Sequence, residues 1–264
     1  TNAPWGIDGA ALESRFGLPC FIINDFSAIA WGVLLLDPGA PGQLVPLRRP
    51  DGSMAECSTD GVIAVLGAGT GLGCGFITRD GGRPRVYPSE GGHAGIPAYD
   101  EDTRAFSLWL DRAYGFAAGA EAGVSGQGIA NLFRFLAEHE GKPSAQVGAI
   151  LKAVESERPA MIAAAAESDA LCAKVMDMFV RLYARVASDL ALTVLPTGGL
   201  FLAGGIAAKN ERWFVDGFCF MDSFMRSYRQ HVREIMEATP VYIVKDYGIS
   251  IYGAAHAATI LSAV

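Results

Sequence analysis

The stretch VIAVLGAGTGLGCGFIT, residues 62–78, is the part of the sequence that decides the fold. Residues 62–66 and 74–78 are two apolar runs with the length and composition of β-strands. The connection between them, GAGTGLG at 67–73, alternates glycine with other residues. We expect two strands joined by a glycine-rich turn, followed by a further short strand at 84–87.

The glycine-rich turn is a candidate phosphate site. Its spacing does not match G-x-G-x-x-G, and G-x-x-x-x-G-K-[ST] occurs nowhere in the chain, so neither the dinucleotide fingerprint nor the P-loop applies. Backbone N–H groups in such a turn can still hold phosphate oxygens, and Thr70 adds a hydroxyl. The candidate ligands are Gly67, Gly69, Thr70, Gly71 and Gly73. The alternative is a glycine-rich hairpin without a ligand.

Upstream, the run CFII at 20–23 predicts a strand, and residues 26–36 predict an apolar helix. Asn24 and Asp25 lie between them, where ligand groups gather in α/β proteins. A carboxylate at such a position can accept a proton from a substrate hydroxyl, although Asn and Asp are also the preferred N-cap residues. A short helix is expected over 8–17, and the Pro/Gly-rich stretch 37–61 predicts a loop.

Downstream, Glu90 and His93 flank a Gly-Gly pair that would let a ligand approach the backbone, or they are ordinary surface groups. Residues 200–203 and 241–244 predict strands, and the first of these ends in Gly204-Gly205, where a flat ring could be admitted. Helices are expected over 103–114, 127–140, 144–155, 160–167, 170–193 and 248–264. The alternation of strands and helices predicts an α/β fold.

Composition excludes several classes of protein. The 264 residues are 51% hydrophobic and 19% charged, which is typical of a globular chain. The net charge is −7 without a basic stripe, which argues against a nucleic-acid partner. The longest apolar stretch, 169–196, carries six charged residues, too many for a membrane span. Five scattered cysteines show no zinc spacing and suit a reducing cytosol, and we expect no metal held by side chains.

Taken in order, five segments resemble the bacterial glucokinase family of the actin-like sugar kinases. They are FIINDF at 21–26, GAGTGLG at 67–73, EGGH at 90–93, Glu121 with Ser125-Gly126, and LAGGI at 202–206. The chain has no cysteine between 74 and 172, so it looks like the branch without a zinc motif. The resemblance implies a two-lobed actin-like ATPase (ribonuclease H-like) α/β fold, with residues 1–36 and 247–264 in a small domain and 37–246 in a large one.

The resemblance also implies roles. The reaction would be ATP-dependent phosphorylation of glucose at its 6-hydroxyl in the cytoplasm, within glycolysis, with Mg²⁺ carried by the nucleotide. Asp25 would be the catalytic base, and Asn24 would bind the 3- and 4-hydroxyls. Glu90 and His93 would hold hydroxyls toward the anomeric carbon, and Glu121 the 1-hydroxyl. Residues 67–73 would bind phosphate, and Gly204 and Gly205 adenosine. A homodimer is a further expectation.

The main departure of the sequence from the family pattern concerns the first phosphate loop. The family opens with an Asp-x-Gly-Gly-Thr phosphate loop, and nothing before Asp25 matches it. We therefore expect an incomplete small domain. Two alternatives stay open: a kinase for another hexose, and a non-catalytic sugar-binding or regulatory protein.

Overall fold

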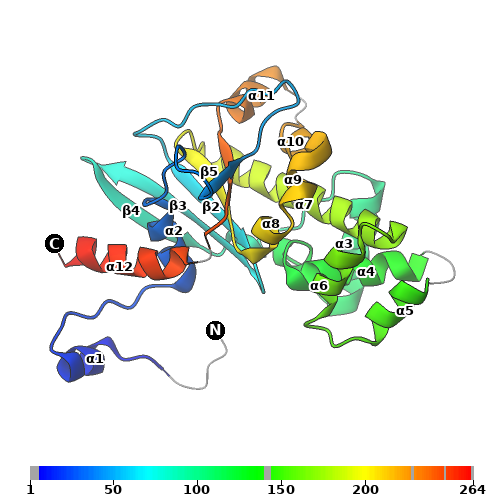
Figure 1. Ribbon diagram of the computed structural model, residues 1–264, viewed down its shortest axis with the longest axis horizontal. Helices are drawn as coiled ribbons and strands as arrows, with labels where there is room; N and C mark the ends of the chain where they lie inside the picture. The colour runs from blue at the N-terminus through cyan, green and yellow to red at the C-terminus, as the bar shows by residue number, and fades with distance from the viewer. Residues whose placement is uncertain (1–5, 140–143, 227–228, 247, 263–264) are drawn as a thin grey trace.

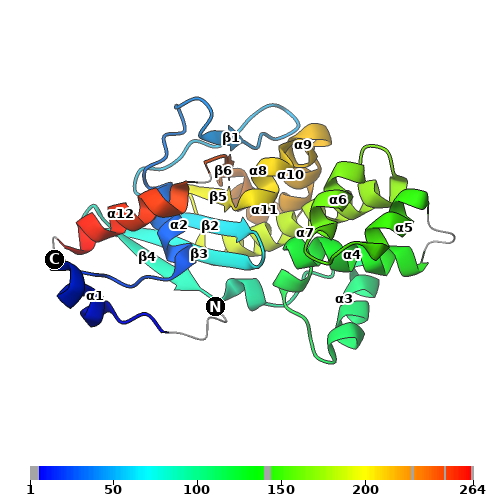
Figure 2. The ribbon, with the colours of Figure 1, turned by 60° about the horizontal axis from the view of Figure 1, so that its bottom comes forward.

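The computed structural model describes residues 6–139, 144–226, 229–246 and 248–262. Within them one six-stranded sheet lies between two layers of helices (Figures 1 and 2). Its strands run in the order β1-β6-β5-β2-β3-β4. Their bounds are β1 Leu44–Pro46, β2 Ile63–Ala68, β3 Leu72–Asp80, β4 Arg83–Ser89, β5 Gly199–Ala203 and β6 Val241–Val244.

Strand direction changes at the centre of the sheet. β2, β5 and β6 are parallel neighbours, whereas β3 and β4 continue from β2 as an antiparallel meander. β2, β5 and β6 consist almost wholly of buried residues, because helices cover both of their faces. The carboxyl ends of β2 and β5 therefore meet at one edge of the sheet, where α/β proteins bind ligands.

The larger core lies on the face of the sheet covered by α7 (Ala170–Val194). Alternate residues of β2, namely Ala64, Leu66 and Ala68, point into this core. The other α-helices between α2 and α12 are α3 Glu101–Tyr114, α4 Gly126–His139, α5 Ala145–Lys152, α6 Arg158–Ala165, α8 Gly205–Lys209, α9 Glu211–Val215, α10 Cys219–Phe224 and α11 Gln230–Glu237. None of the helices in the described part of the chain has both the length and the hydrophobicity needed to cross a membrane.

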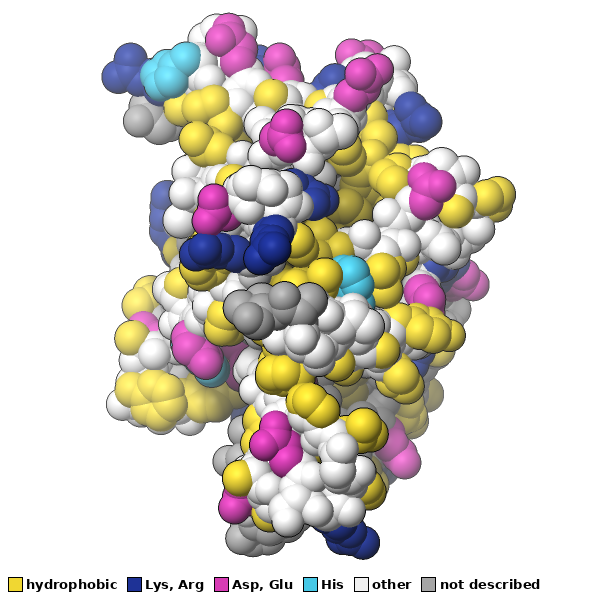
Figure 3. Space-filling view, turned by 90° about the vertical axis from the view of Figure 1, so that its left-hand side faces the viewer, with side chains coloured by type: hydrophobic (Ala, Val, Ile, Leu, Met, Phe, Trp, Pro, Cys, Tyr) yellow, Lys and Arg dark blue, Asp and Glu magenta, His cyan; other side chains and the backbone are white. Residues whose placement is uncertain are grey.

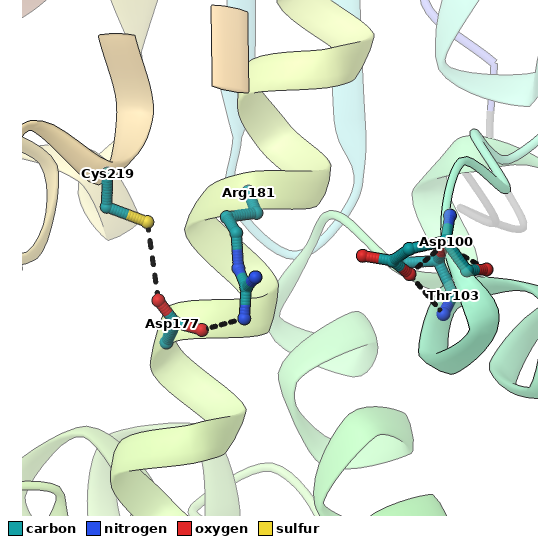
Figure 4. A network of polar contacts seen from close by, with 5 residues as sticks. All are labelled: Asp100, Thr103, Asp177, Arg181 and Cys219. Carbon is teal, nitrogen blue, oxygen red and sulfur yellow. Dashed lines mark hydrogen bonds and ion pairs between the residues drawn. The ribbon is translucent and has the colours of Figure 1, made fainter. Parts of the chain in front are cut away.

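A polar network connects two helices of this layer (Figure 4). The Asp177 carboxylate on α7 accepts hydrogen bonds from Arg181, one turn further on, and from Cys219 Sγ of α10 at 3.4 Å. Burial and the neighbouring Asp177 raise the pKa of Cys219 to about 12, so its thiol keeps the proton that it donates. Asp100 and Thr103 form a separate capping box that begins α3. No residue predicted to bind sugar or nucleotide belongs to either group.

The opposite face of the sheet is covered by α2 (Asp25–Val33) and α12 (Ile249–Leu261), which lie side by side (Figure 2). They share a second apolar cluster with strand residues such as Val65 and Phe201. The two helices approach closely at Gly253. A Cβ there would overlap the Ala28 carbonyl oxygen and come within 2.5 Å of the Gly32 nitrogen. The bare backbone at Gly253 therefore sets the position of α2.

Most predicted elements are confirmed, within one to three residues at each end, and α1 (Gly9–Phe16) begins at the Asp8 N-cap as expected. Residue 140, at the end of one predicted helix, and residues 263–264, at the end of another, lie outside the described residues. β1 and the helices α9, α10 and α11 were not predicted, because elements of three to eight residues carry little periodicity.

The predicted strand over 20–23 is wrong. Residues 18–24 have no strand partner among the described residues, and Phe21 and Ile22 are 42% and 56% exposed. The end of the molecule formed by α1, α12 and β4 has hydrophobic side chains at its surface (Figure 3). Apolar composition alone does not make a strand, because a strand also needs a neighbour that accepts its backbone hydrogen bonds. The division into a small domain (1–36 and 247–264) and a large domain (37–246) stays a prediction.

The contact between α2 and α12 generates a stability prediction. Gly253→Ala should lower the free energy of unfolding by about 2–3 kcal/mol, because backbone rather than a flexible side chain blocks the added methyl group. Thermal denaturation should show a melting temperature lower by roughly 5–10 °C. The control is Gly148→Ala in α5, where nothing lies within 4 Å of an added Cβ. That variant should be stabilised by about 0.5–1 kcal/mol. Equal melting temperatures for the two variants would contradict this account.

Candidate active site

The β2–β3 connection is a three-residue turn, Gly69-Thr70-Gly71, tied to the start of α4. The Gly69 N–H donates to the Gly71 carbonyl, and the Gly69 carbonyl accepts from the Gly126 N–H, both at 2.8 Å. Glu121 Oε2 accepts from the Leu72 N–H at 2.8 Å, and a Cβ on Gly71 would come within 2.5 Å of that oxygen. The turn is therefore held in one conformation by contacts from a segment fifty residues away.

Tyr183 of α7 supports the strand that leads into this turn. Its hydroxyl accepts from the Ala68 N–H and donates to the Leu66 carbonyl, both at 3.1 Å. The side chain is fully buried, which raises the pKa of Tyr183 and keeps its hydroxyl protonated. The predicted phosphate turn thus begins from a strand end that a side chain fixes.

Gly204 brings the end of β5 against the same strand end. Its φ of +85° lies in the region that favours glycine, and a Cβ there would come within 2.5 Å of the Ala68 carbonyl oxygen. Both constraints require glycine at 204. Gly205 is then the first residue of α8, directly beside the turn.

Two cavities meet at the turn. The larger, about 1,020 Å³, has Gly69 and Thr70 on one side and Gly205 and Ile206 on another. Apolar residues of α6, together with Lys209 and Arg212, complete its wall. A cavity with an apolar wall, a glycine-rich turn and cationic side chains suits a purine nucleotide with its phosphates.

The smaller cavity, about 220 Å³, has His93 and Glu121 in its wall together with Tyr114 and Phe116. His93 reaches it because the short helix η1 (Gly91–His93) packs on β3, where a Cβ on Gly92 would overlap the Leu72 carbonyl oxygen. η1 in turn contacts the helix η2 (Ala120–Ala122), with the Ala120 N–H donating to the Ala94 carbonyl at 2.7 Å. The Gly-Gly pair of the EGGH motif therefore serves the packing that brings the imidazole to Glu121.

Two residues, Thr70 and Gln127, line both cavities. Sequence reasoning proposed Thr70 but not Gln127, whose side chain donates to Asn131 Oδ1 and Glu155 Oε1 at 3.2 Å each. The available signal was its position in the run SGQG at 125–128, where Gly126 lets helix α4 start against the turn and Gly128 lets it pack against Gly123.

The structure places Asn24, Asp25 and Glu90 outside both cavity walls. Asn24 is the N-cap of α2, accepting from the Phe26 and Ser27 N–H groups at 2.9 and 3.1 Å, and Asp25 begins the helix. Asn24 and Asp25 are exposed. Glu90 is exposed as well, and its Oε2 lies 3.7 Å from His93 Nε2. The structure thus brings Thr70, His93 and Glu121 together in the wall of the smaller cavity, whereas Asn24, Asp25 and Glu90 lie outside that wall.

Gly67 and Gly73 lie in strands rather than in the turn, as a cross-strand pair. A Cβ on either would come within 2.6 Å of the Phe26 ring. Their predicted contact with phosphate stays a prediction, whereas their contact with Phe26 is observed.

Comparison with known proteins identifies this arrangement. The model of the Glucokinase family matches residues 1–260. The glucokinase of Nostoc punctiforme is 32% identical over 97% of this chain and 76% of its own length. The chain belongs to the glucokinase family. The predicted enzyme class, a glucose kinase, is confirmed with it.

Solved glucokinases share the fold. A glucokinase from an Antarctic psychrotroph matches with a TM-score of 0.77 at 25% identity, over 95% of this chain and 72% of the other. A ROK family glucokinase from Streptomyces griseus, solved with glucose and AMPPNP, matches with a TM-score of 0.62 at 20% identity, over 95% and 72%. The predicted actin-like sugar-kinase fold is therefore confirmed.

The support given by Tyr183 can be tested. Tyr183→Phe keeps the ring but removes two buried hydrogen bonds, so the free energy of unfolding should fall by about 1–2 kcal/mol. Because the deleted bonds hold the strand before the turn, the KM for ATP should rise several-fold while the KM for glucose changes less. Tyr242→Phe is the matched control, since among the described residues its hydroxyl has a single polar contact, with Cys57 Sγ at 3.5 Å. The account is wrong if the KM for ATP responds equally in both variants.

Proposed function

We propose that this glucokinase transfers the terminal phosphoryl group of ATP to the 6-hydroxyl of glucose, giving glucose 6-phosphate and ADP, with Asp25 as the base. The observation that supports this best is the shared wall of the two cavities. Thr70 and Gln127 separate a nucleotide-sized space from a sugar-sized one. Phosphoryl transfer needs little covalent help from the protein, but it needs the two substrates aligned across such a boundary.

The larger cavity fits ATP. The apolar side chains of α6 and the bare backbone at Gly205 would hold the purine ring, and the turn at 69–71 offers backbone groups and the Thr70 hydroxyl to the phosphates. No group of three or more metal-ligating side chains occurs among the described residues, so the ATP phosphates themselves would supply most ligands of Mg²⁺. When bound, that ion neutralises charge on the transferred phosphoryl group.

The smaller cavity fits a hexose. A sugar presents mainly hydroxyls, and His93 with Glu121 supplies one imidazole and one carboxylate from its wall. Asn24 and Glu90 would add further hydroxyl ligands from the margin of the cavity. A bound sugar would cover these groups, and a polar group covered without a hydroxyl partner is costly, so this set would reject sugars that lack one. Asp25, at the start of α2, would take the proton as the 6-hydroxyl attacks the phosphoryl group.

Other readings of the same site are a kinase for another hexose and a non-catalytic sugar-binding protein. Both would bind sugar at His93 and Glu121, but only the first would turn over ATP. The retained carboxylate at 25 favours catalysis. The reaction would take place in the cytoplasm, within glycolysis, and a homodimer belongs to the same proposal.

The role of Asp25 is tested by Asp25→Asn. The amide keeps the size and the hydrogen-bonding oxygen of the side chain but cannot accept the hydroxyl proton. The kcat for glucose phosphorylation should fall roughly 10³-fold, while the glucose-induced rise in melting temperature stays near that of the parent chain. Near-normal turnover would remove Asp25 as the base. A parent chain that binds glucose without turnover would favour the sugar-binding reading.

Glu121 has two tasks in this structure, and two substitutions separate them. Glu121→Gln keeps an oxygen for the Leu72 N–H but loses the charge, so sugar binding should weaken about tenfold with little change in the KM for ATP. Glu121→Ala also releases the turn, so the KM for ATP should rise as well. Steady-state kinetics with both substrates distinguishes the variants, and an unchanged KM for glucose in both would exclude Glu121 from the sugar site.

A further inference from the structure

Three glycines of the motif that decides the fold surround one aromatic ring. A Cβ on Gly67 would lie 2.6 Å from Phe26 Cε2, and one on Gly73 would lie 2.5 Å from the same atom. A Cβ on Gly75 would lie 3.8 Å from Phe26 Cδ1. These glycines occupy one face of β2 and β3, since Gly67 pairs with Gly73 and Gly75 follows two residues later. Their backbones form a flat surface, here called the glycine seat, on which the Phe26 ring rests.

The same residue is joined to the predicted base. The Phe26 N–H donates to Asp25 Oδ1 at 2.8 Å and to Asn24 Oδ1 at 2.9 Å. Asp25 itself is exposed, and this bond is with the very next residue. The ring of Phe26 therefore packs the start of α2 against the sheet.

The glycine seat also lies next to the phosphate turn. Beyond the pair Gly67–Gly73 there is one further strand pair, Ala68–Leu72, and then the turn at 69–71. A ring fixed on the seat thus fixes the start of α2 relative to Thr70. Phe26 is half-buried and packs against the apolar cluster on this face of the sheet, so a smaller side chain there would let the start of α2 shift.

We propose that Phe26 is a positioning residue for phosphoryl transfer: seated on Gly67, Gly73 and Gly75, its ring holds the Asp25 carboxylate at a set distance from the phosphate turn. This inference rests on the proposed function, because it assigns Phe26 to the alignment of the base. It also gives Gly67 and Gly73 a task other than binding phosphate.

The test compares steady-state kinetics of the parent chain, Phe26→Ala, Phe26→Leu and Val33→Ala. Val33 is a buried residue of the same helix and the same apolar cluster, but it lies in the last turn of α2. Phe26→Ala should lower kcat at least 30-fold with less than a threefold change in the KM for ATP. Phe26→Leu, which fills part of the seat, should recover a substantial part of that loss. Val33→Ala should lower the melting temperature comparably and leave kcat within threefold.

A second pair of variants tests the seat itself. Gly73→Ala places a methyl group against the ring and should lower kcat as Phe26→Ala does. Combining it with Phe26→Leu makes room for that methyl, so the double variant should be more active than Gly73→Ala alone. Additive losses would overturn the proposal, because independent structural damage does not compensate.

The outcomes distinguish a failure of the proposed function from a failure of the role assigned to Phe26. A folded parent chain without glucose-dependent ATP turnover overturns the proposed function and this inference with it. An active parent whose Phe26→Ala variant keeps kcat within threefold overturns the inference alone. Loss of kcat in Phe26→Ala and Val33→Ala alike would show general destabilisation, which also overturns it. The active fraction of each variant is taken from its stoichiometry of glucose binding.

Discussion

At the carboxyl end of β2 the backbone is approached so closely by β5 and by α2 that there is no room for side chains. The rest of the site depends on this close approach. Gly204 at the end of β5 lies against the Ala68 carbonyl, and the ring of Phe26 lies against Gly67 and Gly73. Side chains at these glycines would separate β5 and α2 from the strand end by the width of at least a methyl group. Glycine is therefore required here for close approach, with positive φ an added reason only at 204.

Both cavities follow from this contact. With β5 held against β2, α8 starts beside the turn and closes one side of the larger cavity. Glu121 ties the other side of the turn to η2, which carries the carboxylate into the smaller cavity. A change at the turn would consequently be felt in both cavities, as suits a reaction in which one group passes from one substrate to the other.

Elements with strong periodicity and motifs with unusual composition could be predicted from the sequence. The strands at 62–66 and 200–203 and the helix at 170–193 were predictable, because buried strands and long amphipathic helices have distinctive patterns. The strand at 20–23 failed because its apolar pattern says nothing about whether a neighbouring strand is present to pair with it. Gln127 was missed because its importance comes from lying between two cavities, which no local pattern records.

The glycine motif shows why composition alone could not assign these residues. Read along the chain, glycines at every second position look like one phosphate loop. In the folded hairpin only two of these glycines, Gly69 and Gly71, lie in the turn. Gly67, Gly73 and Gly75 lie in the strands, on the face toward α2. An alternating pattern across a hairpin places its outer members on one face of the sheet by the geometry of strands. The regular spacing thus encodes two contacts at once: a bare turn facing the nucleotide-sized cavity, and a bare surface for the helix that begins with Asp25.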